Sequence, residues 1–377
     1  MSWRDVEQAF AKAIEQGVIP GATLIVRHGA DIAYQGAFGF RQREPETAPM
    51  KLDTVFDLAS LTKPLATTIA AMLLVSEGKL RLDERMTRFF PNFGVHGKAA
   101  VTFRHLLAHC SGLAAWRPFY QRVAEIERGG RVNFLGSRGA REFVYEEIHR
   151  EKPEATAGAR AIYSDLNFML LGETIEQIGG SPLDRFCADR IFRPLGLRAT
   201  GFIDLALARL RRLEPAPEMF APTAHCPLRR RMLFGEVDDE NAWAMGGVAG
   251  HAGAFAPVAE VDRIAAELIT AWAGHSQFLP QKIVREFWTR DGTVRDSTWA
   301  LGWDSPSPEY SSSGRHFSPA AVGHLGFTGT SIWIEPEAEI SIALLTNRVH
   351  PRRDNQAIRE FRPKIHDLIM EALGAED

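Results

Sequence analysis

Cysteine is scarce in this sequence. The 377 residues include only three, Cys110, Cys187 and Cys226, which lie far apart and are odd in number. No C-x-x-C pair of the metal-binding type occurs, and separated thiols of this kind do not make a disulfide framework. The cysteines therefore argue against a disulfide-stapled secreted domain and favour a reducing compartment.

Long hydrophobic runs and an excess of one charge are also missing. The longest apolar run, Leu65 to Val75, is too short to span a bilayer, and residues 1–17 carry acids where a signal peptide has an apolar stretch. The net charge is −3 with both signs interspersed, so no broad basic surface invites nucleic acid or anionic lipid. We therefore expect a cytoplasmic protein without nucleic-acid or membrane partners. These patterns leave its oligomeric state open.

The apolar content, 45%, is enough for a large core, and strand-like segments occur near both chain ends. Residues 21–29 and 31–40 read as a hairpin, and β-like runs return at 297–304, 323–337 and 339–348. The region between them is mainly helical, and a last helix is expected over about 355–373. No parallel βαβ alternation and no repeat is visible.

This order predicts an α+β fold in which one antiparallel sheet, flanked by helices, is built from both chain ends. We assign residues 1–57 and 290–377 to a discontinuous sheet lobe and residues 58–289 to an inserted, mainly helical lobe. A loop insertion is expected at about 209–240, where three arginines, Arg229 to Arg231, precede the acids Asp238 to Glu240. We interpret these charges as a solvated loop.

Two Ser-x-x-Lys tetrads occur, and their surroundings distinguish them. Ser60 and Lys63 open a helix after a strand, where residues three apart share a face and free backbone N–H groups gather. Ser76 and Lys79 lie at the other end of the same helix beside a glycine that suits a C-terminal cap. The first tetrad therefore predicts a serine nucleophile with an amine beside it. The second is interpreted as an exposed helix end without a catalytic role.

A serine hydroxyl needs a base within hydrogen-bond reach. For Lys63 to act as the base, its pKa must fall by about three units from roughly 10.4. This shift costs about 4 kcal/mol. A tyrosine beside the Lys63 cation is a second route, because a unit charge at 4 Å contributes about 4 kcal/mol at an effective dielectric near 20. Tyr163, in the segment AIYSDLNF, is a candidate, although a structural role is the simpler interpretation from spacing alone.

Together these segments resemble the serine β-lactamase and penicillin-binding-protein superfamily, and most closely its class C β-lactamase and esterase branch. The family pattern of Ser-x-x-Lys, Tyr-x-Asn and a late Lys-Thr-Gly or histidine variant is similar to SLTK at 60–63, YSD at 163–165 and HLG at 324–326. The phrases GKLRLDERMTRFFP, VTFRHLLAHCSGL and GGVAGHAGAF also resemble the family, and the likeness runs from about residue 20 to 348.

The resemblance implies a β-lactamase/transpeptidase-like fold and an acyl-enzyme without a cofactor or metal. It implies that Ser60 is the nucleophile and that Lys63 and Tyr163 form a coupled base pair. It also implies an oxyanion hole made by the backbone N–H groups of Ser60 and Phe327. Residues implied or proposed to line the substrate site are Asp165, His324, Gly326 and His251.

Two positions depart from the family pattern. Asp165 stands where many relatives have asparagine, and a carboxylate there would hold Lys63 as a cation but would disfavour a nearby phenolate. His324 replaces a lysine that faces the substrate carboxylate, and histidine is mostly neutral at pH 7. We therefore expect short esters or small acyl compounds without an adjacent carboxylate to be preferred over the β-lactam nitrocefin.

The leading hypothesis is a serine hydrolase of esterase type, or a small acyl or amide hydrolase, acting on ester, amide or lactam substrates. A D-aminopeptidase, a DD-peptidase and a weak β-lactamase are alternatives, as is a non-catalytic penicillin-binding-like module. His105 and His109 have a spacing that can bind metal, but the glutamate of an H-E-x-x-H site is absent, so structural histidines are expected.

Overall fold

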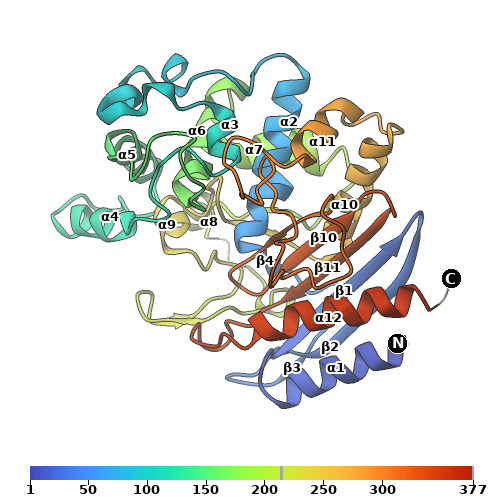
Figure 1. The fold of residues 1–377 in the computed structure, drawn as a ribbon. Helices are drawn as coiled ribbons and strands as arrows, with labels where there is room; N and C mark the ends of the chain where they lie inside the picture. The colour runs from blue at the N-terminus through green and yellow to red at the C-terminus, as the bar shows by residue number, and fades with distance from the viewer. Residues whose placement is uncertain (213–214, 376–377) are drawn as a thin grey trace.

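The central feature of the fold is a six-stranded antiparallel sheet with the order β3-β2-β1-β11-β10-β9 (Figure 1). The structure is a computed structural model that describes residues 1–212 and 215–375. β1 and β11 are neighbours, with Leu24 opposite Leu344, although they lie near opposite ends of the chain. The prediction of an antiparallel sheet built from both chain ends is therefore confirmed. The strands are β1 (Gly21–His28), β2 (Asp31–Gln42), β3 (Ala48–Pro49), β9 (Val322–Leu325), β10 (Ser331–Glu335) and β11 (Ile340–Thr346).

Helices cover both faces of this sheet. Successive side chains of a strand point to opposite faces, so Leu24 of β1 joins the core under α1 (Trp3–Glu15) and α12 (Ile358–Leu373). Ile25 joins the larger core on the other side, which α10 (Val258–Ala273) shares. Figure 1 shows α1 and α12 running side by side along the sheet.

The remaining helices form a second layer above the sheet in Figure 1, as the sequence predicted. A small sheet of two-residue and three-residue strands, in the order β4-β8-β5, connects this layer to the segment that carries Ser60. The other helices are α2 (Ile69–Ser76), α3 (Phe103–Leu107), α4 (Phe119–Arg128), α5 (Arg138–Arg150), α6 (Asp165–Gly179), α7 (Leu183–Cys187), α8 (Leu205–Arg211), α9 (Glu240–Ala244) and α11 (Gln281–Trp288). The short strands are β4 (Phe56–Asp57), β5 (Gly201–Phe202), β6 (His225–Cys226), β7 (Arg231–Met232) and β8 (Ala254–Ala256). Short helical turns are η1 (Ala59–Leu61), η2 (Lys63–Thr68), η3 (Met86–Arg88), η4 (Pro91–Ala100), η5 (Ala188–Phe192) and η6 (Pro217–Met219).

The helix that follows the nucleophile segment is the core of the helical layer. Residues 69–74 of α2 are all buried, which explains why its sequence is apolar all round. Among the described residues, only the stretch Ala59–Ser76 is long and apolar enough to cross a membrane, and 83% of it is buried inside the protein. Burial of this extent is typical of a central helix in the core of a globular protein.

Two local predictions were wrong. Residues 297–304 do not form a strand, because Gly302 turns the chain with a φ of +79° and only Asp304 makes a bridge, to Gly323 of β9. The interpretation of residues 229–240 as a solvated loop is wrong for Arg229 and Asp238, although Arg230 and Arg231 are exposed. The Arg229 side chain is 1% exposed and donates to the carbonyl oxygens of Val237 and Asp238, at 2.6 and 3.1 Å, and Asp238 is buried.

Candidate active site

The segment that carries Ser60 is held by buried hydrogen bonds. β4 ends at Asp57, whose carboxylate accepts from the N–H of Ala59 at 2.8 Å and from the N–H of Asp238 at 2.6 Å. Ala59 has a φ of +46°, an uncommon conformation for a residue with a side chain, so the chain turns sharply just before Ser60. Burial raises the pKa of Asp57 to about 7, against the effect of these N–H groups. The two hydrogen bonds to Asp57 thus hold the backbone turn that precedes Ser60.

Lys63 lies one turn after Ser60 and directs its amine at the serine oxygen. The Nζ atom is 2.9 Å from Ser60 Oγ, 3.1 Å from the carbonyl oxygen of His251 and 2.7 Å from Asp165 Oδ1. The side chain is fully buried, and η2 winds wider than an α-helix at this point. The predicted pairing of Ser60 with Lys63 is therefore present in space.

Tyr163 reaches the same point from the loop before α6. Its ring centroid is 4.9 Å from Lys63 Nζ, and its hydroxyl interacts with both Lys63 and Ser60. The ring stacks on Trp299, with centroids 5.4 Å apart, and packs on His109 at 4.7 Å. The structure thus brings the phenol, the amine and the serine hydroxyl together, and Tyr163 has more than a packing role.

The charges of this group follow from burial and from Asp165. Burial alone would lower the pKa of Lys63, but Asp165 and Tyr163 more than offset it, so that pKa is raised. Burial raises the pKa of Tyr163 although the Lys63 cation opposes the shift. The resting group is an ammonium that shares its three protons among oxygen atoms, beside a neutral phenol.

Two backbone N–H groups of residues that line the cavities at Ser60 have no hydrogen-bond acceptor among the described residues. They belong to Ser60 itself and to Phe327, the residue after the HLG segment. The turn of Phe327 is pinned to the nucleophile segment because Thr328 and Thr330 donate to the carbonyl oxygens of residues 57 and 58, at 2.8 and 3.1 Å. Free N–H groups in such positions can stabilise an oxyanion.

Gly326 is needed at this contact. A Cβ atom there would lie 2.0 Å from Thr330 Oγ1 and 2.7 Å from the carbonyl oxygen of Leu58. Any side chain would push the Phe327 turn away from Ser60. Gly326 therefore positions the backbone of the cleft.

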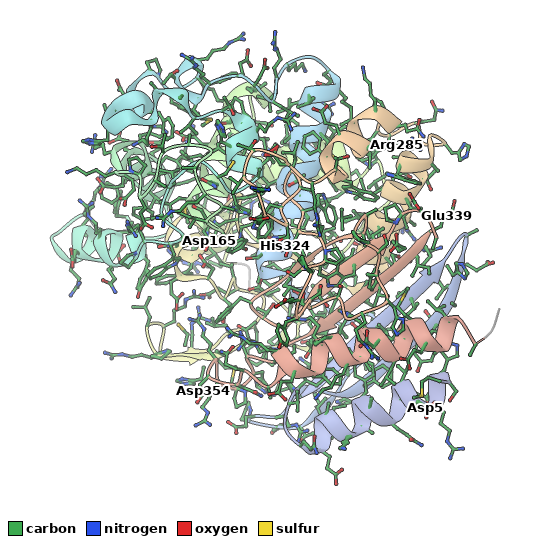
Figure 2. The ribbon with its side chains drawn as sticks, viewed as in Figure 1. Asp5, Asp165, Arg285, His324, Glu339 and Asp354 are labelled. Atoms are coloured by element: carbon green, nitrogen blue, oxygen red, sulfur yellow. The ribbon has the colours of Figure 1, made fainter. Side chains whose placement is uncertain are left out.

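His324 lies on β9 and faces the cleft as a neutral ring. Burial, and then the Lys63 cation, lowers its pKa to about 3. Its Nδ1 is 2.9 Å from the carbonyl oxygen of Leu325, which can only accept, so Nδ1 carries the proton and Nε2 is an acceptor. Figure 2 shows His324 and Asp165 in the central region between the helices and the sheet.

A cavity of about 400 Å³ opens at Ser60 and is lined by Tyr163, Trp299 and His324. Its far wall has three arginines, Arg348, Arg359 and Arg362, of which the first and last are only 5% exposed. In the described part of the chain, the guanidinium groups of these two buried arginines contact carbonyl oxygens and no carboxylate. Burial lowers the pKa of Arg362 to about 10 and also lowers that of Arg348. The two buried guanidinium groups of this wall thus have no ion-pair partner among the described residues, although Asp304 also lines the cavity and Asp238 partly offsets the lowering of the Arg348 pKa.

A second cavity, of about 300 Å³, lies on another side of Ser60. It shares Ser60, Tyr163 and Phe327 with the first cavity, and its wall includes Asp165 and His251. The His251 ring is 1% exposed and its Nε2 is 2.9 Å from Asp239 Oδ1. His251 therefore contributes its backbone to Lys63 and its ring to this second cavity.

Several residues of the site were not predicted from the sequence. His109 accepts from the backbone N–H of Ser164 at 3.0 Å and supports the ring of Tyr163, which makes it a structural histidine as expected but one that positions the phenol. His105 bonds the N–H of Thr102 at the start of α3. Nothing in the local sequence marks Arg348, Arg362 or Trp299, because their role arises from β11, α12 and an irregular loop that meet only in the fold.

Comparisons with known proteins agree with this arrangement. Residues 6–365 match the family model described as Beta-lactamase. A protein of Escherichia coli (strain K12) named D-alanyl-D-alanine carboxypeptidase is 32% identical over 88% of this chain and 79% of its own length. An N-acetylmuramyl-L-alanine amidase of Bacillus subtilis (strain 168) is 32% identical over 92% of this chain and 81% of its own.

Among solved structures, EstCE1, a hydrolase with promiscuous acyltransferase activity, has a TM-score of 0.70 at 22% identity, over 96% of this chain and 98% of that one. At this identity the likeness concerns the fold, which is the predicted β-lactamase/transpeptidase-like one. The family match and the two relatives cover nearly the whole described chain. The chain is therefore a serine hydrolase of the β-lactamase and penicillin-binding-protein superfamily.

Proposed function

We propose that this enzyme hydrolyses esters or amides of small acyl groups through an acyl-enzyme on Ser60. The observation that carries the proposal is the convergence of the Tyr163 hydroxyl and the Lys63 amine on Ser60 Oγ, the amine at 2.9 Å. The two free N–H groups of Ser60 and Phe327 receive the carbonyl oxygen of the substrate as it gains negative charge. Water then attacks the acyl-enzyme and regenerates Ser60.

The contacts favour Tyr163 as the group that takes the proton of Ser60. Lys63 is surrounded by the oxygen atoms of Ser60, Asp165, His251 and Tyr163, so its ammonium donates and has no lone pair to accept with. Ser60 receives a hydrogen bond from Lys63, which leaves its own proton for the Tyr163 oxygen. The phenol first loses its own proton to solvent, and the adjacent cation stabilises the phenolate that remains. This phenolate takes the Ser60 proton as Oγ attacks the carbonyl carbon, and the phenol so formed then protonates the leaving group.

The arginine-lined wall changes the expected substrate. The sequence predicted no adjacent carboxylate because His324 is neutral, but Arg348 and Arg362 place positive charge in the same cavity without a carboxylate partner among the described residues. Buried charges are normally paired. We therefore propose that the substrate carries a carboxylate close to the scissile bond, as the carboxypeptidase name of the Escherichia coli relative also suggests.

Acylation is tested by intact mass after treatment with a fluorophosphonate probe or a short-chain p-nitrophenyl ester. The wild-type protein gains one adduct, and Ser60→Ala gains none and loses at least about a thousandfold in kcat. Folded wild-type protein that stays unmodified by both reagents would favour a non-catalytic binding module instead.

The carboxylate preference is tested with phenyl acetate and 3-carboxyphenyl acetate, which differ by one carboxylate on the leaving group. We expect kcat/KM to be at least about tenfold higher for the carboxylate ester. Arg359→Gln, an exposed position on the same wall, lowers this ratio, and Arg352→Gln, outside the cavity, does not. Equal rates for the two esters would contradict the carboxylate preference. They would leave the proposed acyl-enzyme on Ser60 unaffected. Nitrocefin, added as a third substrate, tests the expected weak β-lactam hydrolysis.

A further inference from the structure

The second cavity at Ser60 is walled by carboxylates. Four acidic side chains line its 300 Å³ from the start of α6 and the segment before α9: Asp165, Asp238, Asp239 and Glu240. Their charges are only partly neutralised. Arg353 pairs with Asp238 Oδ2 at 3.0 Å and with Glu240, and Lys63 pairs with Asp165 at 2.7 Å.

Asp239 remains ionised in this cavity. Burial opposes its charge, but His251, the N–H of Ala242 and Lys63 together lower its pKa to about 2. Four acids and one arginine, Arg353, line the cavity, so its wall has an excess of negative charge next to the nucleophile, although Lys63 pairs with Asp165 and Arg348 also interacts electrostatically with Asp238. This is the opposite of the arginine-lined wall on the other side.

Two buried polar atoms in this wall have no hydrogen-bond partner among the described residues. The Asp238 side chain is 2% exposed, and its Oδ1 receives no hydrogen bond. His251 is 1% exposed, and its Nδ1 also has no hydrogen-bond partner among the described residues. Buried polar atoms are rarely left unsatisfied, so the wall is complementary to a group that brings hydrogen-bond donors and positive charge.

We propose that this cavity binds a primary ammonium group of the substrate, so that the enzyme acts on aminoacyl esters and amides. An ammonium has three donors and no acceptor, which matches a wall of carboxylates that includes the unpaired Asp238 Oδ1. A volume of about 300 Å³ suits one small residue and not a long acyl chain. The inference rests on the proposed acyl-enzyme at Ser60. Together with the arginine-lined wall, it describes a cleft for a short substrate with opposite charges at its two ends.

The test compares phenyl 3-aminopropanoate with phenyl butanoate, in which a methyl group replaces the ammonium. Each kcat/KM is divided by the rate constant of hydrolysis by hydroxide, which removes the difference in intrinsic reactivity. We expect the wild-type enzyme to prefer the ammonium ester by about tenfold or more, the value of one good charged hydrogen bond.

Variants of the wall lower that preference. Asp238→Asn reduces the ratio of the two esters, and Glu240→Gln, which is part-exposed and safer for folding, reduces it in the same direction. Glu286→Gln is the matched control, because Glu286 is exposed and pairs with Arg104 far from the cavity. A wild-type ratio near one, or a ratio that neither wall variant changes, would overturn the ammonium site.

The same experiment separates this inference from the function on which it rests. If phenyl butanoate gives an acyl adduct on Ser60 and the enzyme shows no preference for the ammonium ester, the ammonium site is overturned. The proposed hydrolase function then still stands. Failure of both esters and of the fluorophosphonate probe to modify Ser60 overturns the proposed function itself.

Discussion

Among single residues, Asp165 has contacts that set the charge of both groups beside Ser60. Its carboxylate lies 2.7 Å from Lys63 Nζ, and it raises the pKa of Lys63 and that of Tyr163. An asparagine in its place removes a negative charge and keeps an oxygen that accepts from the amine. The pKa of each group then falls.

We predict that Asp165→Asn moves the pH profile to lower pH. The base must lose its proton to accept that of Ser60, so kcat/KM for phenyl acetate rises with pH as the base titrates. Because both pKa values fall in the variant, the rise begins at a lower pH and the ratio of activity at pH 6 to that at pH 9 increases. Asp83→Asn, a surface change, leaves the profile in place. A shift of the Asp165→Asn profile to higher pH would contradict this assignment of charges.

At the scale of elements, the site depends on how β9 and its following turn meet the segment after β4. Gly326, Thr328 and Thr330 make this contact, and the hydroxyls of the two threonines donate to the carbonyl oxygens of residues 57 and 58. Displacement of the turn by a fraction of an ångström misaligns the N–H of Phe327.

Gly326→Ala is predicted to lower kcat by about a hundredfold or more while the protein stays folded, because one oxyanion donor is lost. The check is kcat for phenyl acetate together with the melting temperature. Gly292→Ala is the control, since a Cβ at Gly292 meets nothing within 4 Å. An active Gly326→Ala enzyme would show that the turn does not hold the oxyanion.

Elements with a clear period were predictable, and those defined by distant partners were not. The two β-rich runs at residues 21–29 and 31–40 give the β1–β2 hairpin, and the apolar residues after Ser60 give a buried helix. Residues 297–304 look like a strand because of Trp299 and Trp303, but Trp303 is buried beside Trp288 in the helical core and not in the sheet. Asp238 looks solvated because its partner, Arg353, is more than a hundred residues away.

The same division holds for the site. Ser60, Lys63, Tyr163 and Asp165 lie in short segments that resemble family motifs, and the structure brings them together. The arginines of the first cavity and the acids of the second are charged residues of ordinary appearance in the sequence. Only their convergence on the two cavities marks them, and that is not visible before the fold is known.

At the scale of the whole molecule, the sheet and the helical layer are joined by a buried ion pair. Arg27 of β1 lies 2.6 Å from Asp262 of α10, and their side chains are 14% and 4% exposed. Arg27→Ala leaves the Asp262 carboxylate buried and unpaired, and we predict a loss of about 3 kcal/mol in the free energy of unfolding.

Urea unfolding measures this loss, and kcat of the folded variant is expected to stay unchanged because the pair is remote from Ser60. Asp83→Ala breaks the exposed Arg81–Asp83 pair, whose side chains are 70% and 71% exposed, and should leave the midpoint unaltered. If Arg27→Ala and Asp83→Ala lower the free energy of unfolding equally, the Arg27–Asp262 pair stabilises the fold no more than an exposed pair does.

The pairing of β1 with β11 has a consequence for biosynthesis. Leu24 leaves the ribosome early, whereas Leu344, its partner, is translated more than three hundred residues later. Until then the apolar faces of the hairpin and of α10 lack their central strand, and a contact of such long sequence separation forms slowly. A nascent chain stalled before residue 340 should therefore bind chaperones and resist labelling at Ser60, and release of the finished chain should restore both.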